Sequence, residues 1–218
     1  MLINIAIDGP SGAGKSSISN LLASKLSYVH LDTGAMYRAV AYAALKRNIA
    51  LDDEDNVVKM IASINLDMKS DGTIICDGED ITKKIREPHM SMAASDVSKL
   101  KNVRVALVEM QRKISSKKGY ILDGRDIGTV VLTDAEVKIF LTASPEERTK
   151  RRLLQNKKNG IESNYDELYK EIVARDYQDS HRDNSPLKKA DDAIEIDSSS
   201  MSIDEVVNEI LKHVNNIK

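Results

Sequence analysis

The chain has 218 residues, of which 41% are apolar and 30% are charged, and its formal net charge is −2. This length and composition predict one globular domain with a well-buried core. The nearly balanced charge gives no overall positive field for a nucleic-acid backbone, and the low aromatic content without Trp argues against a protein that stacks on bases.

The cysteine count and the first residues bear on the compartment. Cys76 is the only cysteine, so no internal disulfide can form. The apolar run at residues 1–7 ends at Asp8, well short of a signal peptide or a membrane span. We therefore expect a cytoplasmic protein with no nucleic-acid or membrane partner.

Five short apolar runs predict an α/β fold with a parallel sheet. Residues 3–7 form the first run and are followed by the turn Asp8-Gly9-Pro10, the pattern of a central strand buried on both faces. The other four runs are residues 28–31, 120–122, 137–141 and 193–196.

Helical periodicity separates these runs. Ile18, Leu22 and Leu26 share one face of a predicted helix, and a second apolar stripe lies near the C-terminus. Ser202, with Glu205 three places later, predicts the start of that last helix.

Two segments depart from this alternation. Around the turns Asp71-Gly72 and Asp77-Gly78, alternating residues predict a small antiparallel insert. Residues 148–163 form a basic helix with no long apolar stripe, which predicts a mobile lid. The prediction is a single domain over residues 1–218. Its core comprises about 1–62, 89–147 and 164–218, its insert about 63–88 and its lid about 148–163.

A glycine-rich loop follows the first strand. Residues 9–16, Gly-Pro-Ser-Gly-Ala-Gly-Lys-Ser, fit the pattern G-x-x-x-x-G-K-[ST] between a strand and a helix. Such a loop turns its N–H groups toward phosphates, Lys15 reaches the β and γ oxygens, and Ser16 can bind Mg²⁺. A glycine-rich turn without a ligand is the alternative. We expect ATP to be bound by Gly9, Pro10, Ser11, Gly12, Ala13, Gly14, Lys15, Ser16 and Ser17.

The acceptor has to be sought outside this loop, because ATPases and GTPases also have one. The Asn-Lys-x-Asp stretch common in GTPases is missing from the sequence. Arginines instead gather where predicted strands end or in a late helix, at Arg38, Arg125, Arg175 and Arg182. Arginine forks onto phosphate oxygens and spreads positive charge over a transferring phosphoryl group, so this pattern predicts a kinase.

Three stretches resemble the bacterial cytidylate kinase family in order and spacing. They are residues 31–38 (LDTGAMYR), 122–131 (LDGRDIGTVV) and 175–182 (RDYQDSHR), the last followed by Asn184-Ser-Pro-Leu187. The similarity runs nearly from end to end. It implies a P-loop kinase fold with a five-stranded parallel sheet flanked by helices, a small antiparallel NMP-binding insert and a helical lid. It also implies a monomer that transfers the γ-phosphoryl group of ATP to CMP or dCMP with Mg²⁺.

A nucleoside monophosphate suits this set of residues as the acceptor. Its second pKa is about 6, so it is already an anion near neutral pH and needs no general base. A kinase for an alcohol would instead need a positioned carboxylate.

The resemblance implies roles for the residues in these stretches. Arg38 and Arg125 hold the acceptor phosphate, with surface ion pairing as the alternative. Asp126, with Ser95 and Arg104, faces the pyrimidine. A carboxylate accepts a hydrogen bond from the cytosine 4-amino group and repels the oxygen that uracil has there. Ser95 can equally bond its own helix backbone.

Arg175, Asp179 and Arg182 fall at i, i+4 and i+7, so a helix would place them on one stripe. Solvated helical salt bridges are the alternative, and the family places these residues around the acceptor's ribose and phosphate. The complete predicted acceptor site is Thr33, Tyr37, Arg38, Ser95, Arg104, Arg125, Asp126, Arg175, Asp179 and Arg182. The predicted catalytic residues are Lys15, Arg125 and Arg182.

The basic segment and the end of the third apolar run bear on the lid and the metal site. Arg148, Arg151 and Arg152 make the lid basic, either as a solvated helix or over the triphosphate, and we assign Arg151 to the ATP site. Asp123 ends an apolar run as a Walker B aspartate would, behind Ser16 at the Mg²⁺ site or as a buried partner of the loop.

Some residues depart from the family pattern. Thr33 replaces a serine and keeps the hydroxyl, whereas Gln178 and His181 replace residues that are often Arg and Asn. The four histidines have no ligand spacing, and we expect structural or surface roles for His30, His89, His181 and His213. A P-loop kinase for another monophosphate or a metabolite, and a nucleotide-binding switch, remain as alternative functions.

Substitution of the loop lysine tests the donor site. Lys15→Ala should cut kcat severely, on the order of 100-fold or more, because it removes a cation that stabilises charge in the transition state. Steady-state kinetics would measure this, and near-full turnover by the variant would refute the assignment.

Overall fold

The computed structural model describes residues 1–69 and 71–217 and separates into two compact units. The first unit joins Met1–His30 to the chain from Lys118 onward, and the second is Leu31–Lys117. Residue 70, within the predicted insert, lies outside the described part of the chain. No helix in the described ranges is long and apolar enough to cross a membrane.

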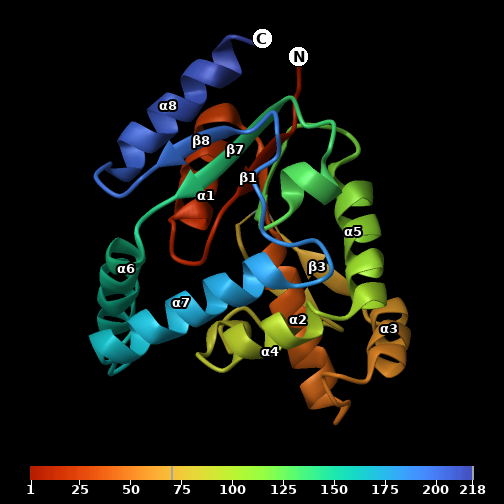
Figure 1. Ribbon diagram of the computed structural model, residues 1–218. Coiled ribbons are helices and arrows are strands. Elements are labelled where there is room, and N and C mark those ends of the chain that lie inside the picture. Colours follow the sequence, from red (N-terminus) through yellow and green to blue (C-terminus); the bar gives the residue numbers. More distant parts are fainter. Residues whose placement is uncertain (70, 218) are drawn as a thin grey trace. The chain divides into compact units, whose positions relative to one another are not determined.

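A five-stranded sheet has the strand order β2-β6-β1-β7-β8. Figure 1 labels β1, β7 and β8 of this sheet. Parallel pairing joins β1 to β6 and to β7, and β7 to β8. The predicted five-stranded parallel sheet is thus confirmed. Its strands are β1 (Ile5–Asp8), β2 (Val29–Asp32), β6 (Tyr120–Gly124), β7 (Val137–Thr142) and β8 (Ile194–Asp197).

The core of the first unit forms where helices cover this sheet. β1 is buried at every position, as expected for a central strand. Ile18 and Leu22 of the first helix pack in one cluster with Val207 and Ile210 of the last helix and with residues of β1 and β7. The helices of this unit are α1 (Lys15–Leu26), α6 (Pro145–Lys158), α7 (Tyr165–His181) and α8 (Ile203–Asn215), with one π-helical turn, η2 (Ile127–Val131).

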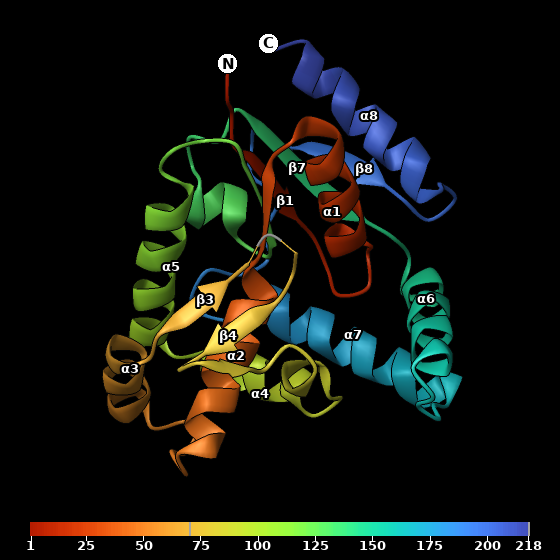
Figure 2. The ribbon, with the colours of Figure 1, turned by 180° about the vertical axis from the view of Figure 1, so that it is seen from behind.

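The second unit holds a three-stranded antiparallel sheet and four α-helices within its described residues (Figure 2). The sheet comprises β3 (Leu66–Met68), β4 (Ile74–Cys76) and β5 (Glu79–Asp80), which confirms the predicted antiparallel strands. Ala41, Met90 and Val97 form a buried cluster between two of the helices. The helices are α2 (Thr33–Lys46), α3 (Glu54–Ser63), α4 (Met90–Val97) and α5 (Lys101–Ser115), with the 3₁₀ turn η1 (Lys84–Arg86).

The N-terminus of α8 has the capping box that the sequence predicts. The Ser202 hydroxyl accepts from the Glu205 N–H at 3.3 Å, and the Glu205 carboxylate accepts from the Ser202 N–H at 2.7 Å. Two otherwise unpaired backbone donors are satisfied in this way.

Removal of this cap should lower the stability of the protein and leave the glycine-rich loop and the residues around it unchanged. We expect Ser202→Ala to lower the free energy of unfolding by about 1 kcal/mol, measured by urea denaturation. The exposed Ser200 offers a matched control. Ser200→Ala should change stability by less than about 0.5 kcal/mol. Equal losses in the two variants would contradict the capping role.

Candidate functional site

The glycine-rich loop joins the carboxyl end of β1 to the start of α1. At Gly9, a Cβ atom would lie 2.0 Å from the carbonyl oxygen of Leu141, so no side chain fits there. Gly14 has a φ of 95°, a left-handed conformation that glycine adopts without strain, and it directly precedes the helix. The backbone therefore wraps closely against the sheet and ends at a helix N-terminus, which favours a bound anion.

Lys15 turns its side chain back onto this loop. Its Nζ donates to the carbonyl oxygens of Gly9 at 2.8 Å and Pro10 at 2.7 Å. Burial, helped by the nearby charge of Arg125, lowers the pKa of Lys15 to about 7, and Asp123 and Asp8 only partly oppose this. The ammonium is thus held by dipoles in a poorly solvated place, where an anionic ligand would stabilise it strongly.

Asp123 lies beside the helix start at the end of β6. Its carboxylate accepts from Ser16 Oγ at 3.0 Å and lies 2.5 Å from His30 Nε2. Burial alone would raise the pKa of Asp123, but His30, Lys15 and Ser16 together hold it below its usual range. Hydroxyl and carboxylate oxygens side by side suit Mg²⁺, which prefers oxygen ligands. Asp123 is therefore a buried hydrogen-bond partner of the loop, one of its two predicted alternatives, and the metal-site role stays a prediction.

His30 was not expected at this site. Its Nδ1 lies 2.8 Å from Asn20 Oδ1, so the ring bridges α1 and the Asp123 carboxylate. The expected structural role holds, but the contact with Asp123 has no signal in the sequence, because the two residues are 93 positions apart.

Arg125 and Asp179 form a buried ion pair in the same unit. Arg125 Nε donates to Asp179 Oδ2 at 2.7 Å, and Arg175 Nε lies 4.0 Å from the same oxygen. Burial of Asp179 would raise its pKa, but Arg125, then Arg175 and Arg182, outweigh burial and keep the pKa below its usual value. The carboxylate stays ionised and orients the guanidinium groups around it.

Arg182 departs from the predicted helical stripe. The helix α7 ends at His181, and Arg182 has an extended backbone with φ −70° and ψ 143°. Its Nε donates to the Ser185 carbonyl oxygen at 2.7 Å, and its guanidinium lies 4.0 Å from the Asp126 carboxylate. The prediction of one stripe is correct for Arg175 and Asp179 and wrong for Arg182, which the turn after the helix directs toward Asp126.

Asp8 is a buried carboxylate for which the sequence predicts no role. Its two oxygens accept from the N–H groups of Ile127 and Gly128, each at 2.7 Å. Burial raises the pKa of Asp8 to about 6, and the two backbone donors oppose that rise. Asp8 directly precedes the glycine-rich loop in the sequence. It therefore links the loop to the segment after Asp126, whose N–H groups it binds.

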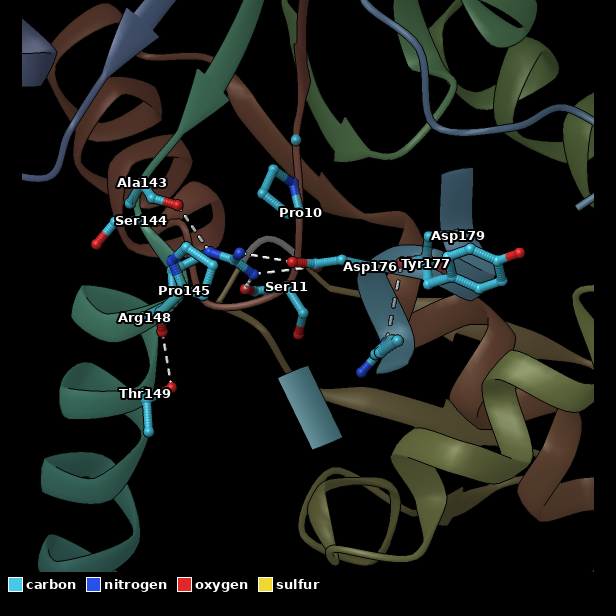
Figure 3. A network of polar contacts seen from close by, with 12 residues as sticks. Pro10, Ser11, Ala143, Ser144, Pro145, Arg148, Thr149, Asp176, Tyr177 and Asp179 are labelled. Atoms are coloured by element: carbon cyan, nitrogen blue, oxygen red, sulfur yellow. Dashed lines mark hydrogen bonds and ion pairs between the residues drawn. The ribbon is translucent and has the colours of Figure 1, made fainter. Parts of the chain in front are cut away.

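Arg148 and Arg151, two arginines of the predicted lid, hold the backbone of the glycine-rich loop. Arg148 donates to the Ser11 carbonyl oxygen at 3.0 Å, to Ala143, and through two nitrogens to Asp176 of α7 (Figure 3). Arg151 approaches the Ala13 carbonyl oxygen at 3.3 Å. Arg148 is buried, and its hydrogen bonds connect α6 to α7 and to the loop.

The remaining predicted acceptor residues belong to the second unit. Arg38 Nη2 donates to Asp32 at 3.1 Å, and Asp32 also caps α2. The guanidinium of Arg104 lies 5.6 Å from the centre of the Tyr37 ring, a cation–π distance. Thr33 and Ser95 are buried in α2 and α4, respectively.

The fold and the loop of the first unit define a P-loop nucleotide-binding protein. A family model described as cytidylate kinase matches residues 5–216. Because this match spans nearly the whole length, the chain belongs to the cytidylate kinase family, as the sequence motifs predict.

Named relatives agree with this assignment. The chain is 54% identical over 213 residues to a cytidylate kinase of Caldicellulosiruptor bescii, covering 96% of this chain and 94% of that protein. It is 50% identical over 215 residues to a cytidylate kinase of Bacillus velezensis, covering 97% and 96%. An uncharacterized protein of Eubacterium ventriosum has a crystal structure with a TM-score of 0.55 at 14% identity, covering 99% of each chain, which shows a shared fold alone.

The Arg148 contacts predict a large effect on stability. Arg148→Met should lower the free energy of unfolding by about 2–3 kcal/mol, because it leaves Asp176 and two carbonyl oxygens without their donor. Urea denaturation would measure the loss.

Arg152 is the matched control, since it lies on the same helix and makes a long hydrogen bond, at 3.5 Å, to the nearby Gln155. Arg152→Met should change stability by less than about 0.5 kcal/mol. A similar midpoint for the two variants would contradict the role given to Arg148.

Proposed function

We propose that this protein transfers the γ-phosphoryl group of ATP to CMP or dCMP, giving ADP and CDP or dCDP. Within the cytidylate kinase family, the observation that carries this proposal is the segment Asp123–Asp126 at the carboxyl end of β6. Asp123 contacts Ser16 of the loop, Arg125 pairs with Asp179, and Asp126 lies near Arg182. One short segment thus carries groups suited to metal, phosphate and base.

On the donor side, residues 9–17 are proposed to hold the phosphates of ATP. The close approach of the loop backbone to β7 at Gly9 and the buried ammonium of Lys15 support this role. Arg151 is the proposed lid contact, because it already lies against the Ala13 carbonyl oxygen of the same loop. Ser16 is the proposed Mg²⁺ ligand with Asp123 behind it. When bound, Mg²⁺ would supply positive charge that offsets the negative charge of the phosphates.

On the acceptor side, Arg38 and Arg125 are the proposed phosphate contacts. The ionised Asp179 supports a role for Arg125, since it fixes the guanidinium direction at 2.7 Å. Arg175, Asp179 and Arg182 are proposed to surround the ribose and phosphate. Thr33 and Tyr37 complete the proposed acceptor contacts.

Cytosine recognition is proposed for Asp126, assisted by Ser95 and Arg104. Asp126 is only 5% exposed, so water would compete little with a ligand that donates a hydrogen bond to its carboxylate. The 4-amino group of cytosine is such a donor, whereas uracil presents an acceptor.

The transfer itself needs charge stabilisation more than proton abstraction. The acceptor phosphate is already ionised near neutral pH, so no general base is proposed. Lys15, Arg125 and Arg182 are the proposed catalytic residues, whose positive charges would stabilise the oxygens of the transferring group. The monomeric state and the cytoplasmic location remain predictions.

A coupled assay with ATP, Mg²⁺ and a panel of monophosphates tests the function. We expect strong turnover of CMP and dCMP with little of UMP or AMP. Preferred turnover of another monophosphate or of a metabolite would replace the proposed acceptor. ATP hydrolysis that no acceptor stimulates would instead support a nucleotide switch.

Asp126→Ala tests the base contact. The ratio of kcat/KM for CMP to that for UMP should fall roughly 100-fold, because the carboxylate that accepts from cytosine and repels uracil is lost. Asp191→Ala, at an exposed position of the same unit, is the control and should keep the wild-type ratio. An unchanged ratio in Asp126→Ala would remove this residue from the recognition of the base.

A further inference from the structure

Asp8 occupies the centre of the carboxyl edge of the sheet. In the parallel register of β1 it stands beside Gly124 of β6 and Phe140 of β7. Its side chain is 4% exposed, an unusual position for a carboxylate unless hydrogen bonds satisfy it.

The partners of Asp8 are the first two N–H groups of the turn η2. Its Oδ1 accepts from Ile127 and its Oδ2 from Gly128, each at 2.7 Å. N–H groups at the start of a helical turn have no partner within the turn, and a carboxylate there is normally supplied by the residue just before it. In η2 that residue is Asp126.

Asp126 does not cap its own turn. Within the part of the chain that the structure describes, its side chain makes no capping hydrogen bond to η2. Its carbonyl oxygen instead accepts from the N–H groups of Val130 at 2.8 Å and Val131 at 3.2 Å, which fixes its backbone. The carboxylate that caps η2 is that of Asp8 in β1, 119 positions from Ile127 in the sequence.

We infer that Asp8 is a positioning residue for acceptor specificity, which caps η2 so that the side chain of Asp126 can face the acceptor base. This inference rests on the proposed role of Asp126. Both oxygens of Asp8 accept from η2, so acceptance of a hydrogen bond from the base is assigned to a second carboxylate, that of Asp126. Asp8 reaches these N–H groups from the buried central strand β1. Its hydrogen bonds therefore fix the start of η2, and with it the backbone of Asp126, relative to the sheet.

Close packing below the turn supports this positioning. A Cβ atom on Gly128 would lie 3.2 Å from Lys138 Cδ and 3.4 Å from Asp8 Oδ2. Lys138 is itself anchored to Asp192 at 2.7 Å and to the Thr133 carbonyl oxygen at 2.8 Å. The turn therefore rests on two fixed side chains, and a change at Asp8 would displace it.

The experiment compares CMP with UMP in the full-length enzyme. Asp8→Asn keeps the side-chain size but turns one acceptor into a donor that faces a backbone N–H. We expect the CMP-to-UMP ratio of kcat/KM to fall roughly 10- to 100-fold, because a small misplacement of Asp126 loses the base contact. Both acceptors use the same ATP site, so any damage to the neighbouring loop cancels in this ratio.

A double variant tests whether Asp8 acts through Asp126. Asp8→Asn combined with Asp126→Ala should give the same CMP-to-UMP ratio as Asp126→Ala alone. Asp126→Ala removes the carboxylate that Asp8→Asn would only displace. Ser202→Ala serves as a control for general destabilisation and should keep the wild-type ratio. Should Asp8→Asn not fold, Asp8→Ser avoids the facing donors and retains one acceptor, with the same expected direction.

The outcomes separate this inference from the proposed function. A wild-type ratio in the folded Asp8 variant, beside a lost ratio in Asp126→Ala, would overturn the positioning role alone. A further fall in the double variant would also overturn it, since Asp8 would then act independently. No CMP preference in the wild type, or none lost in Asp126→Ala, would instead remove the proposed recognition on which the inference rests.

Discussion

Parallel pairing of β1 with β6 and β7 is the constraint on which the charged site of the first unit depends. Parallel strands all end at one edge of their sheet, so the loops that follow them share that edge. Asp8 ends β1, and Asp123 and Arg125 lie at the end of β6 or just beyond it. The sheet thus collects charged residues that are more than a hundred positions apart in the sequence.

Collected and buried charges must compensate one another. Asp123, Asp179 and Asp8 are each largely buried, and each accepts hydrogen bonds from groups that the fold holds fixed. Such networks are costly when one member is missing, since the remaining charge is left without a partner. The arginines and carboxylates therefore orient each other, and this orientation suits catalysis by charge stabilisation, which requires little rearrangement of the protein.

The sequence predicts the parts of this arrangement that are local. A strand, the loop and a helix follow one another in residues 3–26, and the pattern of each is visible without the rest of the chain. The contacts of His30, Asp8 and Arg148 could not be predicted, because no spacing rule connects residues on different strands and helices. The spacing of side chains also predicted that the late helix includes Arg182, but the helix ends at His181. Side-chain spacing does not show where the backbone leaves the helix.

Lys15 shows how this structure favours a ligand. Its pKa of about 7 lies below the ordinary value of 10.5, mainly because burial disfavours the charged form. A folded-state pKa lowered in this way makes the protonated lysine destabilising: the cost is complete below about pH 7 and disappears above the unfolded pKa. Near neutral pH the protein without a ligand therefore carries most of this cost. A polyphosphate beside the ammonium would reduce this cost by favouring the charged form, so part of the desolvation cost of Lys15 would be recovered as binding energy for an anion.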